Sequence, residues 1–276
     1  MSAPNRATVI NKTAKVLKKH YKPVVPPSDR SVLEHMLYGC CLENSKHDAA
    51  DVAFAKLQET YFDWNEIRVT TVAELSEVMS GLRDAEEAAR RLKRTLHHMF
   101  EKNYSFDIDL LRKQNLGKAV KEIEGYSGIT PFVVAYVVQN ALGGHSIPLN
   151  AGAFKLFVVL GVISENEAAK LRVPGLERTI AKSKGVEFGS LLQQLAVDYD
   201  ASPFSPSVRS IILEIAPDAK ERLPKRAVKK KAGKKKKITA TTKKAPKKAT
   251  PKKAAKAPAK KAKKSASKSL ARKKPR

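Results

Sequence analysis

Cysteine and aromatic residues are scarce in this sequence, and it has no long apolar run. Its only two cysteines, Cys40 and Cys41, are adjacent, and neighbouring residues rarely form a disulfide because the geometry is strained. No stretch reaches the ~18 apolar residues that a transmembrane helix needs, and the N-terminus lacks the apolar segment of a secretory signal. We therefore expect a soluble, intracellular protein that has neither disulfides nor a membrane span.

The motifs that mark several enzyme classes are also missing. There is no Gly-rich phosphate loop followed by Lys-Ser or Lys-Thr and no Gly-x-Ser-x-Gly nucleophile turn, so nucleotide hydrolysis and acyl transfer have no support. The six histidines show no metal-ligand spacing. His97 and His98 are neighbours on a predicted helix and cannot easily both face one ion. We expect these two histidines at the surface and predict no metal site.

Acidic residues are absent from the last part of the chain, residues 225–276. This segment holds 25 of the 54 Lys and Arg residues, whereas residues 1–224 hold the other 29 together with all 27 Asp and Glu residues. The formal net charge of +27 is therefore concentrated in the segment. We call residues 1–224 the body and residues 225–276 the tail, and we expect the body to fold as one domain or two small ones.

The tail consists almost wholly of Lys, Ala, Pro, Ser and Thr and has no aromatic residue. It cannot offset the chain entropy of folding by burying apolar surface, so we predict that it is disordered when free. Binding of such a segment to DNA phosphates releases counterions, which gives little sequence preference and a steep salt dependence. The tail lysines that we predict to bind DNA include Lys234, Lys235, Lys236, Lys237, Lys252 and Lys253.

One unit of the tail, Thr250-Pro251-Lys252-Lys253, is similar to the repeated units in the tails of linker histones and of bacterial histone-like proteins. That resemblance implies a DNA-binding tail. The composition also fits a solubilising tail, a localisation signal, or a patch that binds RNA or an anionic membrane surface. DNA is favoured over these because the body indicates it independently.

Apolar residues recur at helical spacing through the body up to residue 130, without the alternation of a strand. The body is therefore predicted to be all-α. Ser28 and Asp29 are expected to cap a helix over residues 31–42, and Thr71 with Glu74 has the spacing of a capping box. Further helices are predicted over residues 8–20, 84–102 and 107–124, and over 49–62 with an inner face of Val52, Phe54, Ala55, Leu57 and Tyr61.

A glycine-containing turn precedes the apolar segment that follows residue 131. Thr130 can cap a helix there and Pro131 suits its first turn. The resulting helix-hairpin-helix motif, with its hairpin at residues 126–132, can direct a helix N-terminus at one phosphate. The same turn before a buried helix without a ligand would look alike. The residues predicted to bind DNA here are Ser127, Gly128, Ile129, Thr130 and Pro131.

The order of these pieces over residues 8–218 resembles the endonuclease III type of helix-hairpin-helix DNA glycosylase. Residues 36–40, Met-Leu-Tyr-Gly-Cys, are similar to the family's Leu-Leu-Ser-Ala-Gln, and Gly81-Leu82 before a long helix is similar to its Gly-Leu. Residues 126–134 resemble its Leu-Pro-Gly-Val-Gly-Arg-Lys-Thr-Ala, and residues 149–154 resemble its Val-Asp-Thr-His-Ile-Phe. The resemblance implies two helical lobes that flank a DNA-binding cleft.

The sequence departs from this family at the positions that carry its chemistry. The resemblance places a nucleophilic lysine at Phe132 and an aspartate that stabilises the cationic sugar at Asn150. A neutral amide cannot replace that charge, and Asn150 can instead cap a helix over residues 151–162. The family's iron–sulfur cluster is not expected, because its cysteine ligands have no counterpart in residues 191–217. The acids considered as substitutes are Asp107, Asp109, Glu122 and Glu124.

These observations favour a DNA-binding protein with a cluster-free glycosylase fold that is catalytically weak or inactive. The expected partner is double-stranded DNA, with damaged DNA as one case, and no cofactor or membrane is expected. We expect a monomer at the nucleoid in the cytoplasm, or in the nucleus if the host is eukaryotic. Two alternatives stay open: an active monofunctional glycosylase of base excision repair, and a histone-like architectural protein of the nucleoid.

Overall fold

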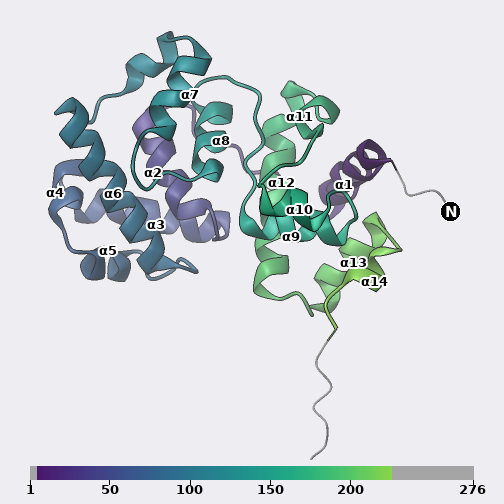
Figure 1. The fold of residues 1–276 in the computed structure, drawn as a ribbon. Coiled ribbons are helices and arrows are strands. Elements are labelled where there is room, and N and C mark those ends of the chain that lie inside the picture. The colour runs from purple at the N-terminus through teal and green to yellow at the C-terminus, as the bar shows by residue number, and fades with distance from the viewer. Residues whose placement is uncertain (1–4, 226–276) are drawn as a thin grey trace, which may run out of the picture. The chain divides into compact units, whose positions relative to one another are not determined.

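The computed structural model describes residues 5–225, which form helices and loops without a strand (Figure 1). The prediction that the body is all-α is therefore confirmed. The tail lysines named above lie outside the described residues. Within residues 5–225, no helix combines the length and the apolar character needed to cross a membrane.

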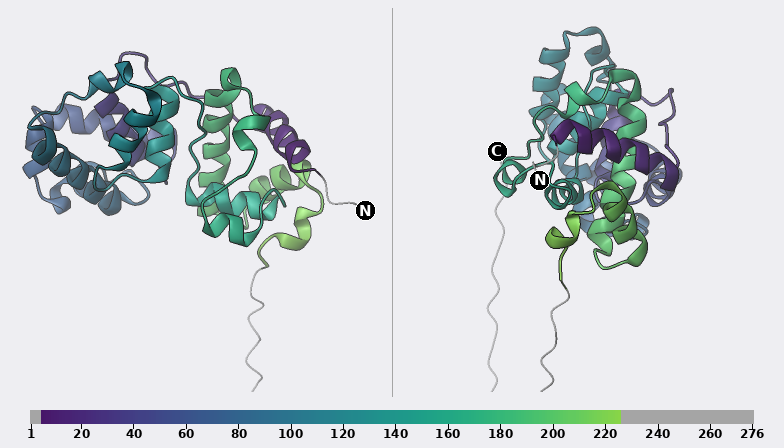
Figure 2. Two further views of the ribbon diagram at one scale, coloured as in Figure 1. Left: turned by 45° about the horizontal axis from the view of Figure 1, so that its top comes forward. Right: turned by 90° about the vertical axis from the view of Figure 1, so that its right-hand side faces the viewer.

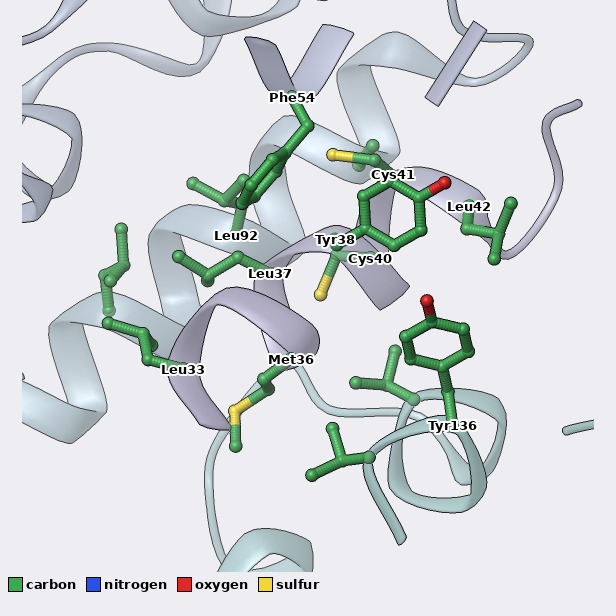
Figure 3. Close-up of a cluster of buried hydrophobic side chains, with 14 of the residues drawn as sticks. Leu33, Met36, Leu37, Tyr38, Cys40, Cys41, Leu42, Phe54, Leu92 and Tyr136 are labelled. Atoms are coloured by element: carbon green, nitrogen blue, oxygen red, sulfur yellow. The ribbon is translucent and has the colours of Figure 1, made fainter. Parts of the chain in front are cut away.

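The first lobe is built around one central helix. Its helices are α2 (Val32–Leu42), α3 (His47–Thr60), α4 (Trp64–Val69), α5 (Val72–Val78), α6 (Ala85–Asn103), the short 3-10 helix η1 (Asp109–Lys113), α7 (Leu116–Glu124) and α8 (Pro131–Asn140). Every residue of α2 except Glu34 is buried. Figure 3 shows α2 with Tyr38 between Phe54 of α3 and Tyr136 of α8, to which its ring centroid lies at 5.7 and 5.9 Å. The apolar core of this lobe is therefore centred on α2.

The second lobe joins the beginning and the end of the described chain. Its helices are α1 (Arg6–His20), α9 (Ala151–Val159), α10 (Glu165–Ala169), α11 (Leu176–Thr179), α12 (Lys182–Ala201), α13 (Pro206–Ile215) and α14 (Ala219–Arg222). α1 buries Val9, Ile10, Val16 and Leu17 in a core shared with the later helices, and Figure 2 shows purple α1 beside the green helices. The chain thus starts in the second lobe, builds the first lobe and returns.

The two lobes are joined where α2 ends. The side-chain amide of Gln193, in α12, donates to the carbonyl oxygens of Leu42 at 3.0 Å and Ser45 at 2.6 Å. The side-chain amide of Asn150, before α9, donates to the carbonyl oxygen of Glu43 at 2.7 Å. Two ion pairs also link the lobes, Lys46 with Asp198 at 2.9 Å and Arg83 with Asp200 at 2.8 Å.

α3 runs over residues 47–60, two residues before the predicted range, and its buried face differs from the prediction. Val52 is 55% exposed and Ala55 is also exposed. The residues that face the core are Ala50, Ala53, Phe54 and Leu57, which recur at the three- and four-residue spacing of one helix face. The prediction for Val52 and Ala55 is wrong because these positions lie off that face.

Residues 107–124 form two elements rather than the single predicted helix. After η1, Gln114 is extended with ψ 163°, and the side chain of Asn115 accepts a hydrogen bond from the N–H of Gly117 at 3.0 Å. Asparagine competes with the helical backbone for such bonds and therefore favours caps over helix interiors. The break leaves Leu110, which was predicted to be on the apolar face, 68% exposed.

The cap of α2 is Ser31, and the prediction of Ser28 and Asp29 is wrong. The Ser31 hydroxyl accepts from the N–H of Glu34 at 3.2 Å, and the Glu34 carboxylate accepts from the N–H of Ser31 at 2.7 Å. Reciprocal bonds of this kind satisfy two N–H groups at once. The capping box predicted at residues 71–74 is confirmed.

Candidate nucleic-acid interface and the adjoining cavity

The hairpin between α7 and α8 depends on one glycine. Gly128 has φ 91°, a conformation that strains other residues, and a Cβ there would lie 2.8 Å from the carbonyl oxygen of Arg91 in α6. Thr130 caps α8, because its hydroxyl accepts from the N–H of Val133 at 3.3 Å, and Pro131 is the first residue of the helix. The predicted local roles of Gly128, Thr130 and Pro131 are confirmed.

Two main-chain N–H groups of the hairpin, those of Gly128 and Thr130, have no hydrogen-bond partner within residues 5–225. The N–H of Ser127 donates to Nδ1 of His98 at 2.9 Å, and that of Ile129 donates to the carbonyl oxygen of Tyr126 at 3.4 Å. Residues 128–130 are partly exposed. Unpaired N–H groups at the start of a helix form a site that favours an anion.

Positive side chains lie beside this hairpin. The Cβ of Arg94, in α6, is 3.1 Å from where a Cβ on Gly128 would lie, and α7 carries the exposed Lys118 and Lys121. None of these three cations forms an ion pair with an acid of the described chain, unlike Arg91, which pairs with Glu43 and Glu87. The surface around the hairpin therefore has positive charge that is not neutralised by the protein.

His98 is partly buried against the hairpin, so its predicted surface position is wrong. Besides accepting from Ser127, its ring lies 6.1 Å from that of Tyr126. Thr95, one turn earlier in α6, donates to the carbonyl oxygen of Ser127 at 3.3 Å. His97 is exposed as predicted and pairs with Glu101 at 3.2 Å. The three-residue spacing of Thr95 and His98 is the sequence signal that places both on one helix face.

Phe132 and Asn150, at the positions of the family's catalytic pair, are both buried. The Phe132 ring stacks on that of Tyr136, with the centroids 6.3 Å apart and an interplanar angle of 18°. The oxygen of the Asn150 amide accepts from the N–H of Ala153 at 2.8 Å, and its nitrogen donates to Glu43. The predicted capping role of Asn150 is confirmed, although α9 ends three residues before the predicted boundary.

Glu43 is the acid that contacts the hairpin, and the sequence analysis missed it. Its carboxylate pairs with Arg91 and accepts from the Thr130 hydroxyl at 3.0 Å. Burial raises the pKa of Glu43, whereas Arg91 and Thr130 oppose that rise. Among the acids predicted as substitutes, Asp109 instead accepts from the N–H of Val32 at 2.7 Å. Glu43 is therefore engaged in holding the hairpin to α2 and α6.

A cavity of about 330 Å³ adjoins Phe132 and has walls from both lobes. Its volume is at the lower end of the ~300–1,000 Å³ range of small-molecule sites. Asp51 is the acid among its lining residues and accepts from the Tyr38 hydroxyl at 2.7 Å. The guanidinium of Arg30 lies 4.0 Å from the centroid of the Tyr38 ring. The aromatic rings of Tyr38, Phe132 and Tyr136 give the cavity flat apolar surfaces.

Three lining residues of this cavity, Gln193, Tyr136 and His47, carry buried polar atoms without a partner in the described chain. The two bonds of the Gln193 nitrogen to main-chain carbonyls fix the amide, which leaves its oxygen as an unpaired acceptor. Burial lowers the pKa of His47 and raises the pKa of Tyr136; Arg30 opposes the latter rise but forms no hydrogen bond of normal geometry with the hydroxyl. Unpaired buried polar atoms are costly, so the cavity suits a ligand or water that would pair them.

The residues present do not fit an iron–sulfur cluster. Cys40 and Cys41 are free and buried in the core of the first lobe, and Figure 3 shows their sulfur atoms on different sides of α2. Burial raises the pKa of both thiols, which disfavours the thiolate that binds metal. No group of three or more His, Cys, Asp or Glu side chains within residues 5–225 could hold a metal ion.

We expect Gly128→Ala to destabilise the protein by about 1–3 kcal/mol, because it adds both a strained φ and a close contact with α6. Gly143→Ala is the matched control: Gly143 has φ 62°, and a Cβ there meets nothing within 4 Å. Urea denaturation of both variants separates the steric contact from the backbone strain. Equal losses of stability would show that the contact with Arg91 contributes nothing.

We expect Asn150→Asp to destabilise the protein by about 1–3 kcal/mol at neutral pH, because a carboxylate cannot donate to Glu43. The low exposure of the position, 3%, should raise the pKa of the new acid above its value in the unfolded chain. A raised folded-state pKa makes the loss of stability smaller as the pH falls, since the protonated form can donate again. Denaturation at neutral and acidic pH checks this, and a pH-independent loss would contradict it.

The comparisons with known proteins identify the fold. No protein-family model and no curated protein sequence matches the chain. A non-covalent endonuclease III–DNA complex is similar in structure, with a TM-score of 0.56, 13% sequence identity, and coverage of 80% of this chain and 99% of that chain. A trapped covalent endonuclease III–DNA intermediate gives 0.50, 15%, 78% and 96% for the same quantities. The chain therefore has the two-lobed helical fold of endonuclease III, a helix-hairpin-helix DNA glycosylase.

Proposed function

We propose that this protein binds double-stranded DNA through its helix-hairpin-helix motif and is weak or inactive as a glycosylase. The observation that carries the proposal is the pair of unpartnered N–H groups on Gly128 and Thr130 at the start of α8. A phosphate oxygen would satisfy both groups, and the helix dipole would favour its charge. Arg94, Lys118 and Lys121 would neutralise neighbouring phosphates.

The proposal of weak or absent chemistry rests on the two family positions. Phe132 has no amine that could attack a sugar carbon, and its ring is packed against Tyr136. Asn150 is neutral, and both of its polar atoms are engaged by the main chain. Without a charge facing the sugar, the cationic transition state of base release loses its electrostatic stabilisation.

The tail extends this proposal. Residues 225–276 would bind the DNA backbone without sequence preference and would keep the body at high local concentration on the duplex. The protein would then act as a monomer on the DNA of the nucleoid, or in the nucleus of a eukaryotic host, on sites that include damaged bases.

Removal of residues 225–276 should weaken DNA binding and flatten its salt dependence, yet leave measurable binding by the body. The apolar residues of both cores lie between residues 9 and 223, so the shortened chain keeps them. The slope of log Kd against log salt should fall by ~0.9 for each phosphate contact removed, as measured by fluorescence anisotropy. Gly128→Ala in the shortened chain should weaken binding further, and Gly143→Ala should not. Complete loss of binding with the tail would favour the architectural alternative.

A second candidate, an active monofunctional glycosylase, is favoured by the cavity. Its aromatic walls suit a flipped base, and Asp51 is an acid at its edge whose side chain is half exposed. Asp51 would then take the role of the family's aspartate. Arg30 at 3.9 Å and the Tyr38 hydroxyl would keep it ionised.

Single-turnover measurement of base release by the full chain separates the two candidates. Our leading proposal expects no release above the uncatalysed rate from duplexes that carry oxidised, alkylated or deaminated bases. If release occurs, the second candidate expects Asp51→Asn to abolish it. Asp48→Asn is the matched control, because Asp48 is exposed on the same helix and does not line the cavity. Release that survives Asp51→Asn would exclude Asp51 as the catalytic acid.

A further inference from the structure

Leu171 holds a backbone position that normally belongs to glycine. It follows α10 with φ 50°, and its N–H donates to the carbonyl oxygen of Ala168 at 2.9 Å while that of Arg172 donates to Glu167 at 3.0 Å. These two bonds form a Schellman motif, in which the left-handed residue is usually glycine because a side chain is strained there. Burial does not compensate for the strain, since Leu171 is 53% exposed.

The loop that carries Leu171 is firmly anchored on both sides. Val173 and Leu176 are buried in the core of the second lobe. Arg6 pairs with Glu167 at 2.9 Å, and the ring of His145 bonds to the carbonyl oxygen of Glu177 at 2.8 Å. Leu171 is therefore an apolar side chain held outward by a fixed loop rather than the tip of a loose one.

Leu171 and the hairpin border one hollow surface. An open groove of about 450 Å³ is lined by Leu171, Arg172 and Pro131. A second groove, of about 520 Å³, shares Pro131, Ala135 and Ser146 with it and reaches Ile129 and Thr130. The hairpin and the loop of Leu171 therefore lie at two ends of a continuous depression along α8.

Arg172 gives this end of the depression a positive charge. Its side chain is exposed and forms no ion pair or hydrogen bond with the described residues, while its main-chain N–H holds the loop. An arginine with free donors beside an exposed leucine suits a DNA backbone next to unstacked bases.

We propose that Leu171 inserts between bases of the duplex whose phosphate the hairpin holds, and that Arg172 binds the backbone beside it. The proposal rests on DNA binding by the hairpin. An apolar wedge unstacks a base step, and the cost is offset by the additional protein surface that the distorted duplex contacts. A wedge must be rigid to act, which the anchored loop provides.

Leu171→Gly tests this proposal because stability and function should change in opposite directions. The full chain carrying this change should melt about 1–4 °C higher, since glycine relieves the strained φ. At saturating protein, it should lose the fluorescence increase of a 2-aminopurine placed beside a single mismatch, where unstacking costs least. Leu110→Ala, at an exposed leucine of the other lobe, should leave that increase unchanged, whereas Leu171→Ala should remove it.

An unchanged fluorescence increase with Leu171→Gly would overturn the proposal, as would an equal loss with Leu110→Ala. Neither result would affect the proposed DNA binding, which is measured separately by the effect of Gly128→Ala on affinity. Failure of the natural chain to unstack the reporter, despite tight binding that depends on Gly128, would also sink the wedge and leave the hairpin's role intact.

Discussion

The carbonyl groups at the end of α2 are the constraint on which the rest of the structure depends. A helix end leaves carbonyl oxygens without partners in the helix, and here the partners come from the other lobe. Gln193 donates to Leu42 and Ser45, and Asn150 donates to Glu43. Because the donors belong to the second lobe, satisfying the main chain of the first lobe fixes the second lobe against it. The cavity, whose walls come from both lobes, exists only while these bonds are made.

The same constraint accounts for the chemistry at Asn150. Its oxygen caps α9 and its nitrogen serves the end of α2. A carboxylate has acceptors alone and could meet only the first need. The gain of a bond between the lobes and the loss of a charge that would stabilise a cationic sugar are therefore one chemical change. Glu43 continues the connection, since its carboxylate binds the Thr130 hydroxyl at the start of α8.

Local features of the fold could be predicted from the sequence, whereas long-range pairs could not. Thr130 and Asn150 were identified as caps because a cap needs only a residue type before a helix. The bond between His98 and the N–H of Ser127 joins residues that are 29 positions apart, and that between Gln193 and Leu42 spans 151. No spacing rule links such residues. The short helix α4 was missed because its six residues are too few to show a periodicity.

Persistence of the hairpin is by itself weak support for DNA binding, because packing alone would require it. Gly128 fits against α6 where no side chain fits, and Thr130 and Pro131 begin a helix of the core. The informative features are those that packing does not explain. Unpartnered N–H groups and an unpaired Arg94 contribute nothing to the folded body alone, and glycine in place of Leu171 would make it more stable. Stability therefore cannot account for that leucine, whereas contact with a partner at this surface can.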